Sequence, residues 1–140
     1  MRLCSDFLRW ARHLWRRSNS IGEAGANPPS PPRICFGRVE FLHSAIDNAD
    51  IESEILYCIY LKGKSRWILF RCPCGCQDVI TLSVQDCHKP HWSLYADTDG
   101  GPTIYPSVWR DKGCLSHFWI RGGRVFWCED TGAFPYNQFR

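Results

Sequence analysis

The 140-residue sequence has no long hydrophobic run, and none of its apolar stretches approaches the roughly 18 residues that cross a bilayer. It also lacks an uninterrupted apolar segment near its start, which argues against a secretory signal. We therefore expect a cytoplasmic protein and do not expect it to associate with a membrane.

Basic charge is scarce outside the first part of the chain. Residues 1–33 hold six arginines and two acids, whereas residues 34–140 hold eleven basic and twelve acidic residues. A nucleic-acid-binding surface needs a general excess of positive charge, although the 14% aromatic content would suit such a surface. The composition thus argues against nucleic acid as a partner.

Cysteine, in contrast, is abundant. The nine cysteines are an odd number, and no secretory signal accompanies them. A secreted disulfide framework is therefore a poor interpretation. Metal-bound or free thiols in a reducing compartment are the better one.

The chain divides into three segments. Residues 1–17 form a predicted amphipathic leader helix, because Leu3, Phe7, Trp10 and Leu14 recur at helical spacing. Residues 18–33 are a Pro-rich linker, and residues 34–140 form the globular domain. We expect the leader to pack on the domain or on a second copy. A membrane-surface or partner-binding helix is the alternative.

The globular domain is predicted to be mainly β. Gly122 and Gly123 separate two of its strands with the spacing of a two-residue hairpin. We expect a small, twisted, antiparallel sheet or a barrel-like domain, organised around a metal site. The predicted strands are Cys35–Leu42, Ile55–Lys62, Arg66–Cys72, Asp78–Val84, Trp92–Ala96, His117–Arg121 and Arg124–Cys128.

A cluster of cysteines and a histidine predicts the metal site. Cys72, Cys74 and Cys76 occupy five residues, and Cys114 and His117 follow with C-x2-H spacing. Zn²⁺ binds four thiolate or imidazole ligands tetrahedrally, so we expect one zinc ion held by four of these five donors. Two alternatives are a [2Fe–2S] cluster and a set of small buried thiols without metal.

The same residues leave several kinds of chemistry open. With three ligands, metal-bound water would attack a carbonyl; with four, a thiol such as Cys72, or Ser107 or Ser116, would act as the nucleophile. His117 is either a ligand or a general base, and Glu40 is a further candidate base. As candidate catalytic residues we name His117, Ser116 and Glu40. No H-E-x-x-H motif of a zinc peptidase is present.

Several motifs are similar to those of one known family. They are CxCGC from Cys72, a following Trp92, the segment Pro106-Ser107-Val108-Trp109, CxSH[FY]WI from Cys114, and V-x-W ending at Trp127. This pattern, over about residues 36–128, resembles a bacterial family of small cysteine-rich proteins. Members of that family occur in operons with ubiquitin-like proteins and E1- and E2-like enzymes.

The resemblance implies a function and partners. It implies a peptidase that processes or removes the ubiquitin-like protein, with that protein or its E1- or E2-like enzymes as partners. The alternative is a non-catalytic, zinc-stabilised β module that docks one of these partners. Neither interpretation determines the oligomeric state.

Overall fold

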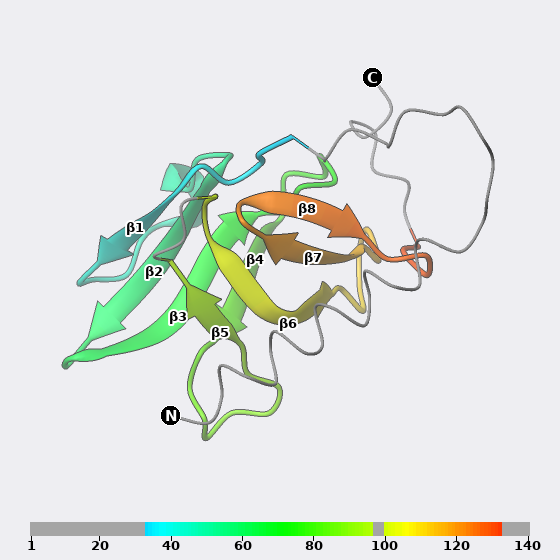
Figure 1. Cartoon of the computed structure of the whole chain (residues 1–140). Helices are drawn as coiled ribbons and strands as arrows, with labels where there is room; N and C mark the ends of the chain where they lie inside the picture. Colours follow the sequence, from blue (N-terminus) through cyan, green and yellow to red (C-terminus); the bar gives the residue numbers. More distant parts are fainter. Residues whose placement is uncertain (1–32, 97–99, 133–140) are drawn as a thin grey trace. The chain divides into compact units, whose positions relative to one another are not determined.

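Eight strands make up the part of the chain that the computed structural model describes, residues 33–96 and 100–132. They form two four-stranded sheets in the orders β1-β2-β3-β4 and β5-β6-β7-β8 (Figure 1). The strands are β1 (Arg38–Leu42), β2 (Ile55–Leu61), β3 (Lys64–Arg71), β4 (Val79–Ser83), β5 (Ser93–Tyr95), β6 (Thr103–Trp109), β7 (His117–Arg121) and β8 (Arg124–Trp127).

The mainly-β prediction is confirmed, with two sheets in place of the expected single sheet. The leader helix at 1–17 and the linker at 18–33 lie outside the described residues, except for Arg33. Within the described ranges, no helix has the length and apolar character of a membrane span.

The first sheet is not wholly antiparallel as predicted, because β1 runs parallel to β2. A parallel pair needs a crossover connection of about a dozen residues or more, and residues 43–54 supply it. This connection contains a short 3-10 helix, η1 (Asn48–Asp50), and buries Ile51 against Ile55 and Tyr57. The crossover thereby covers part of β2, so that strand is buried on both faces from Ile55 to Ile59.

The second sheet is an antiparallel meander. Its β7–β8 turn is the predicted two-residue hairpin, with Gly122 and Gly123 at φ values of 53° and 69°. Strand β6 was not predicted; it contains Pro106, which cannot donate a hydrogen bond to a neighbouring strand. The structure accommodates this proline where the pairing of β6 with β7 is interrupted, between Ile104 and Val108.

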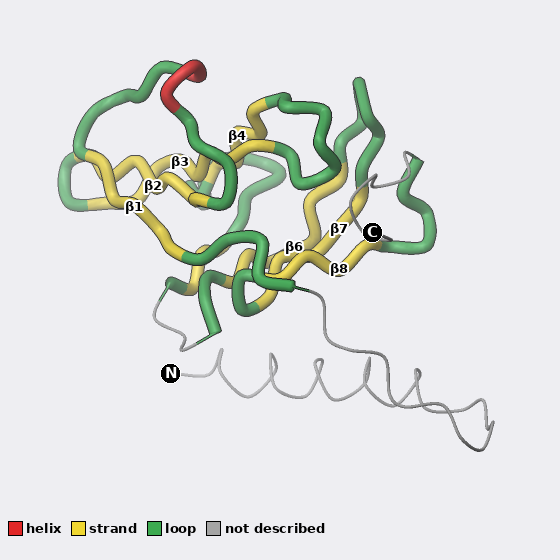
Figure 2. Tube along the Cα trace, turned by 90° about the horizontal axis from the view of Figure 1, so that it is seen from above, coloured by secondary structure: helices red, strands yellow, loops and turns green. Residues whose placement is uncertain are grey.

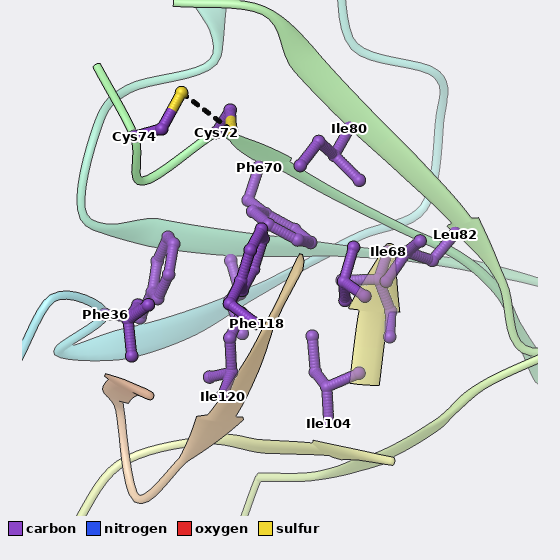
Figure 3. Close-up of a cluster of buried hydrophobic side chains, with 13 residues drawn as sticks. Phe36, Ile68, Phe70, Cys72, Cys74, Ile80, Leu82, Ile104, Phe118 and Ile120 are labelled. Atoms are coloured by element: carbon purple, nitrogen blue, oxygen red, sulfur yellow. Dashed lines mark hydrogen bonds between the residues drawn. The ribbon is translucent and has the colours of Figure 1, made fainter. Parts of the chain in front are cut away.

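One hydrophobic core joins the two sheets. Viewed from above, β1–β4 and β6–β8 lie in separate layers (Figure 2). Phe70 of β3 and Phe118 of β7 are fully buried between them, with ring centroids 6.5 Å apart (Figure 3). Phe36 packs edge-on against Phe70 at 5.3 Å. The inward faces of the strands therefore pack together, and the outward face of β7 carries the alternate residues, beginning with His117.

Candidate active site and metal centre

Four cysteines from two separate loops meet at one end of the core. Cys72 follows β3, Cys74 and Cys76 lie in the turn before β4, and Cys114 lies between β6 and β7. All four sulfur atoms lie within 4.8 Å of one another. Gly75 permits the tight turn, because its φ of 94° is accessible to glycine at little cost.

The spacing of the four sulfur atoms suits a tetrahedral metal ion. Metal–sulfur bonds of about 2.3 Å place neighbouring sulfurs about 3.8 Å apart in a tetrahedron. The Cys72 Sγ atom lies 3.4 Å from Cys74 Sγ and 3.8 Å from Cys114 Sγ. Cys72 and Cys74 are buried beside the core, as Figure 3 shows. The cluster can therefore hold a metal ion, with four thiolates as ligands.

The surroundings of the cluster affect the charge of its thiols. Burial raises the pKa of Cys72, which also lies beside Cys74. Burial also acts to raise the pKa of Cys114, but the hydrogen bonds from Ser116, together with those from Cys74 and Cys72, outweigh it and lower the pKa to about 7. Arg110 adds positive charge nearby, with its Nη1 atom 4.0 Å from Cys76 Sγ. The Cys114 thiol therefore gives up its proton more readily than an ordinary cysteine, as a metal ligand must.

Three further residues, Ser116, Glu40 and His117, were predicted to belong to the site, and none of them is a member of the four-cysteine cluster. Ser116 is fully buried, and its hydroxyl donates to Cys114 Sγ at 3.2 Å. Glu40 lies on β1 in the other sheet and accepts hydrogen bonds from Arg38. His117 is not among the four clustered donors. The groups that face its ring nitrogens are a serine and an aspartate.

Ser107, His117 and Asp130 form a connected chain of hydrogen bonds. His117 Nε2 lies 3.0 Å from Ser107 Oγ, and His117 Nδ1 lies 2.7 Å from Asp130 Oδ1. An ionised carboxylate can only accept, so in the neutral ring the proton is assigned to Nδ1. Nε2 is then free to accept the hydrogen of the Ser107 hydroxyl. This is the arrangement that activates a serine as a nucleophile.

Local backbone structure holds the three side chains together. Ser107 lies in the interrupted part of β6, and its carbonyl accepts a hydrogen bond from Trp92 Nε1 at 3.2 Å. His117 is the first residue of β7, and its backbone N–H donates to Thr131 Oγ1 at 3.1 Å. That bond anchors the turn after β8 beside His117, so Asp130 is positioned next to the ring.

A tryptophan covers one face of the His117 ring. Trp109 lies directly opposite His117 in the β6–β7 pair. The two rings are stacked, with centroids 5.0 Å apart and planes 12° from parallel. Trp109 is itself 64% exposed. The stack therefore restricts the imidazole while leaving the outer face of the indole accessible to a bound molecule.

Neither Asp130 nor the role of Trp109 was predicted from the sequence. A signal for Asp130 was available in the hairpin register. Because the two-glycine turn pairs Arg121 with Arg124, residue 128 lies opposite His117 and the next carboxylates lie just past the strand end. Ser107 was named only as one of several candidate nucleophiles.

The fold and site define a class: a two-sheet β protein that presents the serine–histidine–aspartate arrangement of a serine protease. The comparison with protein families agrees with this class. The model of the bacterial ubiquitination-like system serine protease (BubE) family matches residues 43–128, more than half of the chain. The chain belongs to this family. No curated protein and no solved structure matches it.

Proposed function

We propose that this protein is a serine peptidase that cleaves a ubiquitin-like protein of its bacterial system, with Ser107 as the nucleophile. The observation that carries the proposal is the pair of short contacts, 3.0 Å from Ser107 Oγ to His117 Nε2 and 2.7 Å from His117 Nδ1 to Asp130. Family membership supports both the serine-protease chemistry and the ubiquitin-like partner.

The three residues act in sequence on a substrate carbonyl. Ser107 Oγ attacks the carbonyl carbon while His117 Nε2 takes the hydroxyl proton, and Asp130 stabilises the imidazolium that forms. The imidazolium then gives this proton to the leaving amine, which departs as the C–N bond breaks. Water, activated by His117, hydrolyses the resulting ester and regenerates the Ser107 hydroxyl.

We assign a structural role to the four-cysteine cluster, with Zn²⁺ as the ion. Thiolate ligands favour Zn²⁺, and a site closed by four protein ligands keeps no position for a reactive water. Such an ion would connect the turn after β3 in the first sheet to the loop before β7 in the second. In this proposal His117 is a general base and not a zinc ligand.

One acyl-enzyme accounts for both reactions expected of such a peptidase. Removing a C-terminal extension from a precursor and releasing a conjugated protein both transfer the same acyl group, the C-terminus of the ubiquitin-like protein, to Ser107. The two substrates differ only in the amine that leaves. We place this activity in the cytoplasm, which is supported by the free cysteines of the described residues.

The test is cleavage of a ubiquitin-like precursor that carries a C-terminal extension, using the purified full-length protein. Ser107→Ala and His117→Ala should lower kcat by several orders of magnitude, and Asp130→Asn should do so by about 10⁴-fold through loss of the correct tautomer. Ser93→Ala, at an exposed serine of the same sheet, is the matched control and should retain full activity.

Two results would overturn the proposal. The first is a Ser107→Ala variant that cleaves as fast as the parent. The second is a parent protein that binds the ubiquitin-like protein but never cleaves it, which would favour the non-catalytic docking module.

A further inference from the structure

We propose that His117, Cys128 and Asp130 form a second metal site, at which Zn²⁺ binds reversibly and switches off Ser107. The effect on Ser107 rests on the proposed function, whereas the metal site itself does not. The site differs from the four-cysteine cluster in all of its donors.

The three donors are brought together by the β7–β8 hairpin. Their ligand atoms all lie within 4.8 Å of one another. Cys128 continues β8 opposite His117, and its backbone N–H donates to the His117 carbonyl at 2.9 Å. Residues directly opposite in an antiparallel pair project from the same face, so the Cys128 thiol lies on the face that carries the imidazole. Asp130 completes the set from the following turn.

The geometry needs only a small adjustment to hold the ion. Zinc bonds of about 2.0 Å to nitrogen and oxygen separate those two atoms by about 3.3 Å in a tetrahedron. His117 Nδ1 and Asp130 Oδ1 now lie 2.7 Å apart, so they must separate slightly. The Asp130 side chain is 58% exposed and lies in a turn, which leaves it room to move. The fourth position is open to water from the same exposed side.

Metal binding at this site would disable the proposed general base. A metal ion on Nδ1 displaces the proton from that nitrogen, so the neutral imidazole must carry its proton on Nε2. Nε2 then cannot accept the hydrogen of the Ser107 hydroxyl, and the nucleophile is not activated. The Cys128 thiol releases its proton to solvent as the zinc–sulfur bond forms.

The two sites should differ in affinity. Four thiolates enclose an ion in the first site, whereas the second offers one nitrogen, one sulfur and one oxygen with an open position. The first ion is therefore retained on purification, and the second exchanges with free Zn²⁺ in solution. This difference makes the second site suitable for regulation by the level of available zinc.

The experiment uses the zinc-loaded, full-length protein and a fluorescent fluorophosphonate that labels activated serines. Added Zn²⁺ should slow the labelling of Ser107, and a mild chelator should restore it. Mg²⁺, a hard cation that prefers oxygen ligands, should have no effect. Cys128→Ser should label at the parental rate but need at least about tenfold more Zn²⁺ for half-inhibition, since even outer-sphere changes at zinc sites cost 10–100-fold in affinity.

Cys87→Ser is the matched control, because Cys87 is an exposed free cysteine in the β4–β5 loop. It should respond to Zn²⁺ like the parent. Cys128→Ala is a second variant in case the serine disturbs folding, which circular dichroism would reveal. Equal zinc sensitivity of the parent and of a folded Cys128 variant would overturn the inference.

Calorimetry separates this inference from the proposed function. Titrating Zn²⁺ into the zinc-loaded protein should show one further equivalent bound by the parent and by Ser107→Ala, and binding at least about tenfold weaker by Cys128→Ser. Absence of this second equivalent in the parent would refute the site. If the parent bound the second ion but was never labelled and never cleaved substrate, the site would stand and the assigned catalytic role of Ser107 would fail.

Discussion

The imidazole of His117 is fixed by three contacts, two through its nitrogens and one through its face. Ser107 and Asp130 occupy the nitrogens, and Trp109 stacks on the ring. The hydrogen bonds fix the direction of the ring within its plane, and the stack limits its tilt. Ser107 and Trp109 belong to β6 and Asp130 follows β8, so the pairing of β7 with its two neighbouring strands determines the orientation of the ring.

Trp109→Ala should weaken catalysis without abolishing it. An aromatic pair contributes about 0.5–1.5 kcal/mol beyond the area it buries, so losing the stack should lower the rate at which Ser107 reacts by roughly 2- to 12-fold. Trp109→Phe keeps an aromatic face and should recover most of the rate. The measurement is the rate of fluorophosphonate labelling of Ser107 as a function of pH.

The labelling rate and the melting temperature together show whether Trp109 positions His117 or only stabilises the fold. If Trp109 positions His117, the Trp109→Ala protein should label Ser107 at a changed rate or with a displaced pH profile while its melting temperature stays parental. Parental labelling by a folded Trp109→Ala protein would show that the stack does not assist His117.

At the level of single elements, the β7–β8 hairpin is the part on which the site depends most. It carries His117 at its start, and Asp130 follows its end. Gly123 holds it against the segment before β1, because the Gly123 carbonyl accepts the backbone N–H groups of Cys35 and Phe36. The hairpin turn therefore fixes both its own register and the entry of the chain into the first sheet.

Gly123→Ala should destabilise the protein by about 2 kcal/mol or more. A left-handed conformation costs a residue with a Cβ roughly 1–2 kcal/mol, and the added Cβ would also collide with the Phe36 carbonyl oxygen. Gly37→Ala is the matched control, since nothing lies within 4 Å of the Cβ it would add. Urea-induced unfolding of both variants gives the comparison.

The two variants should differ clearly in the midpoint of unfolding. Gly37→Ala should stay within about 0.5 kcal/mol of the parent, as surface substitutions usually do. Equal midpoints for the two variants would show that the turn tolerates a side chain and that the hairpin relaxes around it.

On the scale of the whole molecule, the core and the cysteine cluster both join the two sheets. Phe70 and Phe118 meet in the shared core. The cysteine cluster joins the turn after β3 to the loop before β7. Because Cys114 is three residues before His117, an ion in this cluster would also anchor the strand that carries the proposed general base.

Removing the ion from the four-cysteine cluster should lower the melting temperature of the whole domain. When the free-ion concentration is about a thousandfold above the dissociation constant, binding stabilises the folded state by about 4 kcal/mol. In a domain of this size that corresponds to a change in melting temperature of roughly 15 °C or more. A strong chelator should therefore destabilise the parent. Cys114→Ser should melt at a similarly reduced temperature and should be insensitive to the chelator.

The control for this prediction is again Cys87→Ser, which should behave like the parent with and without chelator. Elemental analysis of each protein gives the zinc content alongside the melting curves. A Cys114→Ser protein that keeps stoichiometric zinc and the parental melting temperature would contradict the assigned role of the cluster.

Much of the fold follows from local sequence, whereas the pairing of strands does not. Strand β7 has the predicted bounds, and the prediction for β2 was one residue too long. Short segments rich in β-branched and aromatic residues indicate strands without reference to the rest of the chain. The parallel β1–β2 pair was not predicted, because it depends on how the crossover at 43–54 packs over the sheet.

The sequence by itself determined the chemistry that is available: clustered thiols at Cys72, Cys74, Cys76 and Cys114, and a histidine close behind them. It also determined the hairpin, since two glycines at a fixed spacing admit few other turns. These features depend on residue type and on separations of a few residues. In segments this short, covalent geometry limits the backbone to a few conformations.

Only the tertiary structure decided which residues His117 serves. Its distance in sequence from Cys114 is shorter than from Ser107 or Asp130, so spacing favoured a metal ligand. In the folded chain His117 lies on the outward face of β7, where its ring meets Ser107 from β6 and Asp130 from the turn after β8. Sheet register sets these contacts, and register results from the packing of Phe118 and its neighbours in the core, which no short sequence motif encodes.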